Sequence, residues 1–223
     1  MRKAIVSWSS GKDSAFALGE VLRGGEHSVA ELFTTVNETY ARVAMHGSRE
    51  ELLDAQAAAL RLPLAKIRLP WPCPNAVYES RLDDYLRRKK AEGVTHVVFG
   101  DLFLEDIRRY RDEALAKLGL TPVYPLWGRD TRKLAEAMID AGQKAVLVCV
   151  DPSRVPKSLA GREFDRALLA ELPAGADPCG ENGEFHSFVY GSPLFADGGL
   201  IPVRRGETVE RSGFVYADLL PAG

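Results

Sequence analysis

Cysteine is scarce in this sequence. Its 223 residues include three cysteines, at positions 73, 149 and 179, and no Cys-x-x-Cys pair. An odd number of widely spaced cysteines argues against a disulfide framework, a structural zinc site and an iron–sulfur cluster. Because Cys179 has no paired second cysteine, a persulfide–disulfide cycle is also disfavoured.

Long apolar runs are missing as well, and neither sign of charge dominates. No segment approaches the length of a membrane span, and the first residues are typical of a strand rather than of a signal peptide. The 29 Lys and Arg residues nearly balance the 31 Asp and Glu residues, so we expect no bulk attraction to nucleic acid or anionic lipid. We therefore expect a cytoplasmic protein with no membrane association, for which nucleic acid is a disfavoured partner.

Two common nucleotide-binding motifs are absent. Gly-x-x-x-x-Gly-Lys-Ser/Thr occurs nowhere in the sequence, and Gly-x-Gly-x-x-Gly does not follow the first strand. Instead, residues 7–14 read Ser-Trp-Ser-Ser-Gly-Lys-Asp-Ser, between an apolar run at 3–6 and a helical pattern at 15–22. A loop between a strand and a helix N-terminus presents N–H and hydroxyl donors, which favours phosphate binding. Asp13 would repel phosphate unless it held Mg²⁺ directly or through water. The loop therefore predicts a metal–nucleotide site, with an ordinary Ser/Gly turn as the alternative.

The rest of the chain alternates between strand and helix patterns and then changes character. We expect strands at 3–6, 29–36, 64–69, 95–99, 122–126 and 145–150, with helices between them, one of which opens with a capping box at Ser48 to Glu51. This order predicts a parallel sheet covered by helices on both faces. A helix at 162–172 and short β-like runs follow. We expect an α/β domain over residues 1–150 and a small β-rich segment over 151–223.

Ligands of open parallel sheets bind at the carboxyl ends of the strands. We therefore expect Thr35 and Val36 to meet adenine through backbone groups, and Gly100 and Asp101 to meet ribose or metal, with routine turn chemistry as the alternative. Loop residue His46 is a candidate proton carrier or phosphate ligand, against a surface histidine.

Later segments supply candidates for substrate binding. Tyr110 and Arg111 suit an acidic substrate or polyphosphate, although a solvated helix face fits them equally well. Glu181 and Glu184 flank a Gly turn in Asp-Pro-Cys-Gly-Glu-Asn-Gly-Glu-Phe-His-Ser at 177–187. Two such carboxylates could bind an amine, orient ammonia or act as a general base. The alternative is an acidic surface turn.

The first loop resembles the PP-loop, Ser-Gly-Gly-x-Asp-Ser, of the N-type ATP pyrophosphatases, with Ser10 in place of the first Gly. Together with residues 42–47, 100–106, 110–111, 125–128 and 180–187, it resembles the diphthine–ammonia ligase family, whose members are adenine nucleotide alpha hydrolase-like. The resemblance covers essentially the whole chain. It implies a HUP-type, Rossmann-like α/β domain followed by a small C-terminal domain. It also implies that ATP and Mg²⁺ serve to adenylate a carboxylate, which ammonia converts to an amide with release of AMP and pyrophosphate.

The positions of these residues and the resemblance together give candidate roles, of which the resemblance itself implies those of the PP-loop, Gly100, Asp101, Glu181, Gly183 and Glu184. Lys12, Asp13, His46 and Glu184 are the catalytic candidates, with Asp13 as the metal ligand. The PP-loop residues Ser9, Ser10, Gly11, Lys12, Asp13 and Ser14 would hold pyrophosphate and Mg²⁺, with Thr35, Val36, Gly100 and Asp101 around the nucleotide. Tyr110, Arg111, Glu181, Gly183, Glu184 and His186 would meet the acceptor.

The last motif departs from the family pattern. Diphthine-directed members typically read Glu-Gly-Gly-Glu-Phe/Tyr-Glu-Thr, whereas residues 181–187 read Glu-Asn-Gly-Glu-Phe-His-Ser. The acceptor, a small molecule or a modified protein side chain, could therefore be a carboxylate other than diphthine. A PP-loop enzyme modifying transfer RNA or a cofactor, a sulfate-nucleotide reductase and a nucleotide sensor without turnover are the alternatives, and a homodimer stays open.

Overall fold

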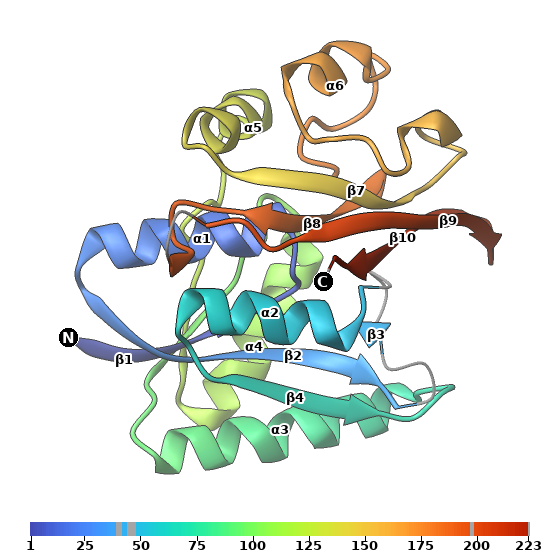
Figure 1. Ribbon diagram of the computed structural model, residues 1–223. Coiled ribbons are helices and arrows are strands. Elements are labelled where there is room, and N and C mark those ends of the chain that lie inside the picture. Colours follow the sequence, from blue (N-terminus) through green and yellow to red (C-terminus); the bar gives the residue numbers. More distant parts are fainter. Residues whose placement is uncertain (39–41, 44–47, 197–198, 223) are drawn as a thin grey trace.

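A computed structural model of the chain describes residues 1–38, 48–196 and 199–222, and the backbone alone of residues 42–43 (Figure 1). Its first sheet contains five parallel strands in the order β4-β2-β1-β5-β6. They are β1 (Arg2–Ser7), β2 (His27–Asn37), β4 (Leu64–Leu69), β5 (His96–Val98) and β6 (Thr121–Val123), and the short β3 (Arg42–Val43) pairs antiparallel with the end of β2. The strand order reverses at β1, so the loop that follows β1 lies at the switch point where such sheets bind ligands. The predicted parallel sheet is confirmed.

Helices cover both faces of this sheet. The helices α1 (Lys12–Gly24) and α2 (Glu50–Leu60) lie on one face, with α3 (Asn75–Ala91) and α4 (Glu105–Leu118) on the other (Figure 1). Along β1, Ala4 and Val6 pack in the core that contains α1, while Ile5 packs in the core that contains Tyr85 and Leu115. This alternation follows from the two-residue period of a strand, and it buries both faces of β1.

A second, antiparallel sheet lies on the outer side of α1 and α2. Its order is β8-β7-β10-β9, made by β7 (Lys144–Val150), β8 (Phe185–Gly191), β9 (Val203–Arg211) and β10 (Phe214–Pro221). The helices α5 (Thr131–Asp140) and α6 (Arg166–Glu171) cover its other face, and a 3-10 turn, η1, spans Lys157–Leu159 (Figure 1). The molecule is thus layered as helices, parallel sheet, helices, antiparallel sheet and helices.

The run at 145–150 was expected to be the sixth parallel strand, and this is wrong. It is β7, and among the strands it pairs with β8 and β10 of the second sheet. Val146 and Val148 pack against Leu52 of α2, while Ala145 and Leu147 pack in the core on the opposite face. A strand buried on both faces has a continuous apolar sequence, which does not distinguish a parallel from an antiparallel strand.

Two helix starts also differ from the prediction. Helix α2 begins at Glu50 without a side-chain cap, and the hydroxyl of Ser48 instead lies 3.2 Å from that of Ser10. The capping-box prediction is therefore wrong, because Ser48 binds another polar group. Helix α6 begins at Arg166 rather than near 162, and Asp165 caps it by accepting a hydrogen bond from the amide of Leu168.

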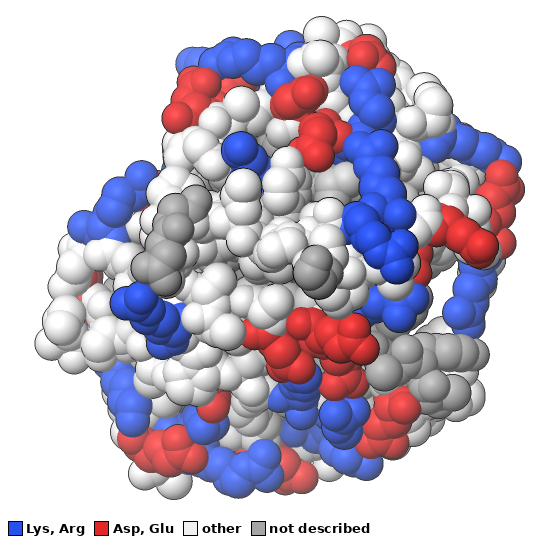
Figure 2. All heavy atoms as spheres, viewed as in Figure 1, with Lys and Arg blue, Asp and Glu red and all other residues white. Residues whose placement is uncertain are grey.

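Charges of both signs are spread over the visible face of the molecule (Figure 2). Acidic side chains gather over α2, which begins with Glu50 and Glu51, and basic side chains form a stripe over the second sheet. Among the described residues, no helix combines the length and apolarity needed to cross a bilayer.

Candidate functional site

The loop between β1 and α1 is held by its own hydroxyl groups. The amide of Gly11 donates to Ser9 Oγ at 3.3 Å, Ser14 Oγ donates to the Gly11 carbonyl at 3.0 Å, and Ser9 Oγ lies 3.0 Å from Ser14 Oγ. The amide of Trp8 donates to the Phe33 carbonyl at 2.7 Å, so the chain stays paired with β2 where it leaves the sheet. The predicted strand, loop and helix are present, and α1 begins inside the loop at Lys12.

Ser10 has the backbone conformation that a glycine would adopt. Its φ is +69°, in the left-handed region, and its side chain is fully buried. The left-handed conformation costs an L-residue about 1 kcal/mol or more relative to glycine. The position where the family motif has Gly is therefore occupied here by a serine whose hydroxyl pairs with Ser48.

We expect Ser10→Gly to be more stable than Ser10→Ala by about 1 kcal/mol. Both variants lose the hydroxyl that pairs with Ser48, so the difference between them reports only the Cβ at positive φ. Urea unfolding of the two variants measures this difference. Equal stabilities would show that the left-handed conformation carries no cost at this loop.

Gln56 connects the loop to the second sheet. Its side chain is fully buried, accepts a hydrogen bond from the Trp8 indole at 2.8 Å, and donates to the carbonyls of Ser10 at 3.0 Å and Val189 at 2.7 Å. The sequence analysis missed this residue. The available signal was a polar residue on the apolar face of α2, next to Leu52, Leu53 and Ala57.

The ammonium group of Lys12 points toward Phe164, Cys179 and Phe185, which lie in the C-terminal part of the chain. It lies 2.8 Å from Asp13 Oδ2, donates to the Cys179 carbonyl, and sits 5.3 and 5.4 Å from the ring centroids of Phe164 and Phe185. The side chain is 2% exposed. Burial lowers the pKa of Lys12, but Asp13, Cys179 and Glu181 together more than offset this, so its pKa is raised and the group stays cationic. Lys12 therefore joins the phosphate loop to the turn that carries Glu181.

The turn that carries Glu181 is stabilised by hydrogen bonds to two buried carboxylates. Asp177 Oδ2 accepts from the amides of Cys179 and Glu181 at 3.2 and 2.9 Å. Glu184 is 1% exposed, and its Oε1 accepts from the Asp177 amide at 3.0 Å and from Asn182 Nδ2 at 3.3 Å. Its Oε2 is buried and has no hydrogen-bond partner among the described residues. Gly183 between them has a φ of +88°. Glu184 thus shapes the turn through one oxygen.

Gly100 and Asp101 follow the end of β5, next to the phosphate loop. A methyl group at Gly100 would lie 2.9 Å from the Asp13 carbonyl carbon and from the Ser14 amide nitrogen, so only glycine allows this approach. Asp101 Oδ2 lies 2.8 Å from Arg111 Nε, and the Arg111 guanidinium stacks 4.3 Å from the Phe99 ring centroid. Burial raises the pKa of Asp101, and Arg111 partly offsets it.

Glu181 reaches the same place from the C-terminal turn. Its Oε1 accepts a hydrogen bond from the Leu102 amide at 2.8 Å. Burial, together with the carboxylates of Asp13 and Asp101, raises the pKa of Glu181 to about 7, although the hydrogen bond from the Leu102 amide opposes this rise. The structure therefore brings together Asp13, Gly100, Asp101 and Glu181, which are far apart in the sequence.

We expect Glu181 to make stability depend on pH. A carboxyl whose pKa rises from 4.5 to about 7 on folding contributes stability that is complete below its unfolded pKa and is lost as pH rises through about 7. Glu181→Gln removes this proton-linked contribution. The free energy of unfolding of the variant, relative to that of the wild type, should therefore be higher at about pH 8 than at about pH 5. Urea unfolding of both proteins at the two pH values measures the change, and parallel pH profiles would contradict the shift.

Other predicted site residues lie elsewhere or outside the described residues. Tyr110 is exposed, and its hydroxyl donates to Glu79 of α3 at 3.3 Å. Val36 is fully buried in β2 and Thr35 is half-buried, so adenine binding through their backbone stays a prediction. His46 lies outside the described residues. Within the described ranges, no group of three or more His, Cys, Asp or Glu side chains is arranged to hold a metal ion.

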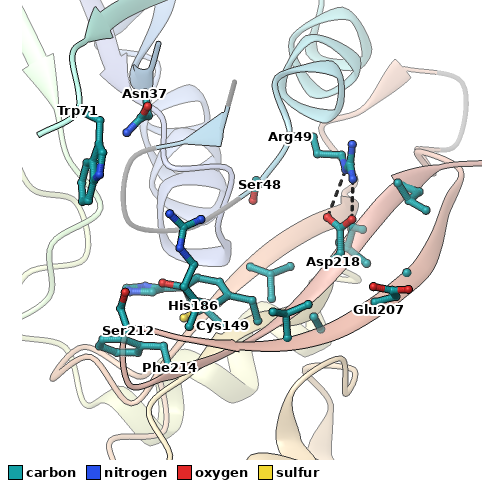
Figure 3. A pocket seen from close by; sticks show the side chains of 18 of the residues that line it. Asn37, Ser48, Arg49, Trp71, Cys149, His186, Glu207, Ser212, Phe214 and Asp218 are labelled. Atoms are coloured by element: carbon teal, nitrogen blue, oxygen red, sulfur yellow. Dashed lines mark hydrogen bonds and ion pairs between the residues drawn. The ribbon is translucent and has the colours of Figure 1, made fainter. Parts of the chain in front are cut away.

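A cavity of about 1010 Å³ lies between the ends of β2 and β4 and the second sheet (Figure 3). Trp71 and Phe214 lie toward one end of it, and the Arg49–Asp218 ion pair lies at the other, with 2.6 Å between Arg49 Nη2 and Asp218 Oδ2. His186 lines this cavity, and burial lowers its pKa to about 4. The predicted acceptor residue His186 is thus neutral at physiological pH.

Comparison with known proteins places this geometry in a family. The family model "Diphthamide synthase N-terminal domain" matches residues 1–122, and "Diphthamide synthase C-terminal domain" matches residues 130–212. The diphthine–ammonia ligase of Danio rerio is 30% identical over 237 residues, which cover 94% of this chain and 89% of that protein. Those of Bos taurus and Homo sapiens are 28% and 27% identical, each over 94% of this chain and 85% of the relative. With both domains matched in order and the phosphate loop joined to the Glu181 turn, the chain belongs to the diphthamide synthase family.

Proposed function

We propose that the chain is an ATP-dependent, AMP-forming ligase that joins ammonia to a carboxylate; its relatives are named diphthine–ammonia ligases. The observation that carries the proposal is the connection between the phosphate loop and the Glu181 turn through Lys12. A ligase of this kind needs a nucleotide and an acceptor side by side, and this connection fixes the two loops relative to each other.

The reaction has two steps. A carboxylate oxygen of the acceptor attacks the α-phosphorus of ATP, and pyrophosphate leaves. Ammonia then attacks the acyl carbon, AMP leaves, and the nitrogen loses a proton to give the amide. In the first step, the N-terminus of α1 and the hydroxyls of Ser9 and Ser14 would stabilise the charge on the departing pyrophosphate.

Mg²⁺ fits this site as an ion held mainly by the phosphates of ATP. Protein sites for Mg²⁺ in nucleotide enzymes commonly use one or two carboxylates and leave the other positions to phosphate and water. Asp13 is a quarter exposed at the end of the loop and could supply such an oxygen. Lys12 already donates to both oxygens of that carboxylate, so we assign Lys12 to positioning Asp13 rather than to binding phosphate.

The acceptor side is assigned to the C-terminal turn. Glu181 lies against the loop after β5, next to Asp13 and Asp101, where its carboxyl could hold ammonium or take its proton. Glu184 shapes this turn through one oxygen, and a role for it toward the acceptor stays a prediction. Diphthine is the acceptor that the names of the relatives indicate. The histidine at 186 leaves another carboxylate as the alternative.

The fate of ATP labelled at the α-phosphate tests the proposal. Purified protein is incubated with Mg²⁺, ammonium and fractionated cell extract, beside the Asp13→Asn variant. We expect labelled AMP only with the wild type, an active fraction and ammonium. ADP as the product would contradict the proposal, and tight ATP binding without turnover in any fraction would indicate a nucleotide sensor instead.

A further inference from the structure

The sequence contains two glutamines, Gln56 and Gln143, and the side chains of both reach the phosphate loop. Gln56 lies on α2 and is 0% exposed, whereas Gln143 directly precedes β7 and is 7% exposed. Gln56 Nε2 donates to the Ser10 carbonyl at 3.0 Å, and Gln143 Nε2 donates to the Lys12 carbonyl at 2.9 Å. Two buried side-chain amides from separate elements therefore hold alternate carbonyls of one loop.

With these two contacts, every carbonyl in the segment 10–12 has a donor from the protein itself. The Ser10 carbonyl accepts a second hydrogen bond, from the Val189 amide at 2.9 Å. The Gly11 carbonyl accepts from Ser14 Oγ at 3.0 Å. A carbonyl oxygen carries partial negative charge and would repel phosphate if it faced the nucleotide. The protein thus binds these three oxygens in its own hydrogen bonds before any ligand arrives.

The direction of a carbonyl fixes the direction of the amide in the same peptide unit. A trans peptide is planar, so its C=O and N–H groups point opposite ways. The contact at the Ser10 carbonyl therefore sets the direction of the Gly11 amide, and the contact at the Lys12 carbonyl sets that of the Asp13 amide. Asp13 lies in the first turn of α1, where an amide has no acceptor inside the helix. Each glutamine thus directs one N–H group of the loop away from itself.

We propose that Gln56 and Gln143 are positioning residues of the ligase, which hold the amides of Gly11 and Asp13 toward the phosphates of ATP. This inference rests on the proposed function, because the departing pyrophosphate is what needs N–H donors in place. Successive amides of a loop make a concave anion site when they point the same way. Donors that are fixed before the reaction need no reorganisation during it. Both glutamines act through the backbone, so neither is a catalytic residue.

Amide NMR of the isotope-labelled full chain, titrated with inorganic pyrophosphate and Mg²⁺, tests this role without turnover. We expect the signals of the Gly11 and Asp13 amides to shift when the wild type is saturated. Gln143→Met keeps the length of the side chain but removes its donor. Its affinity for pyrophosphate should therefore fall about tenfold, and at saturation the shift at Asp13 should shrink while that at Gly11 stays. A general loosening of the structure would reduce both shifts alike.

Tyr85→Phe is the matched control, because it also removes one hydrogen bond of a buried side chain, 2.8 Å to Glu31, in the core on the other face of the first sheet. It should bind pyrophosphate as the wild type does. Wild-type affinity and a full Asp13 shift in Gln143→Met would overturn the proposal while the ligase stands. If Gln143→Met behaves as expected but the wild type forms no AMP from labelled ATP with any fraction, the ligase fails and the positioning role stands. A wild type that responds to neither pyrophosphate nor ATP would overturn both.

Discussion

Replacing Lys12 by methionine should lower the free energy of unfolding by about 3 kcal/mol, a fall in Tm of roughly 6–12 °C. The substitution keeps the apolar part of the side chain between Phe164 and Phe185 but leaves the Asp13 carboxylate without its partner. Breaking a buried ion pair by removing one member commonly costs 3–5 kcal/mol, and we take the lower value because a quarter of Asp13 reaches solvent. Thermal and urea unfolding measure the loss.

A double-mutant cycle separates the ion pair from other effects of the substitution. Asp13→Asn alone leaves the buried ammonium with the Cys179 carbonyl as its hydrogen-bond acceptor, so it should also be destabilised. In Lys12→Met/Asp13→Asn neither charge is left unpaired, and we expect it to be more stable than the sum of the single changes by about 2 kcal/mol or more. The double variant should still form no AMP, because it lacks the Asp13 carboxylate. Additive losses of stability would show that the two groups do not interact.

Gly100→Ala should cost about 3 kcal/mol and abolish ATP binding. The new methyl group would lie 2.9 Å from backbone atoms of Asp13 and Ser14, and backbone cannot turn aside as a flexible side chain can. The start of α1 must therefore move away from β5, which displaces the donors that hold phosphate. Calorimetric titration with ATP and thermal unfolding measure the two effects.

Gly175→Ala is the matched control for this prediction. Nothing lies within 4 Å of a methyl group at Gly175, and its φ is not in the left-handed region. The change should leave stability within about 0.5 kcal/mol of the wild type and ATP affinity unchanged. Normal ATP binding by Gly100→Ala would show that the loop tolerates displacement and that the close approach is not needed for the site.

Much of the first sheet and its helices could be predicted from the sequence because their signals are local. The strand, Ser/Gly loop and helix around Ser9–Ser14 follow one another within a few residues, and the alternation of strands and helices predicts a parallel sheet. The carboxyl-end rule then directs attention to Gly100 and Asp101. Gly100 packs against the backbone of Asp13, and the contact of these two residues with ribose or metal stays a prediction.

The remaining features depend on partners far apart in the sequence. The Lys12 ammonium is oriented by the Cys179 carbonyl, and the Gln56 side chain is held by the Val189 carbonyl. The sequence around Lys12 or around Gln56 gives no signal of either partner. β7 reads like the parallel strands before it, because burial of both its faces removes the alternation that would have distinguished it. A cavity bounded by two sheets cannot be predicted before their packing is known.

The covering of the phosphate loop by β8 makes nucleotide affinity a property of the whole chain. The Lys12 amide and Ser187 hydroxyl that meet there are 175 positions apart in the sequence. A substitution in the interior of the second sheet, far from any bound nucleotide, would therefore lower the affinity for ATP if it loosens that contact. By linkage, bound ATP would strengthen the packing of the two sheets by the same free energy.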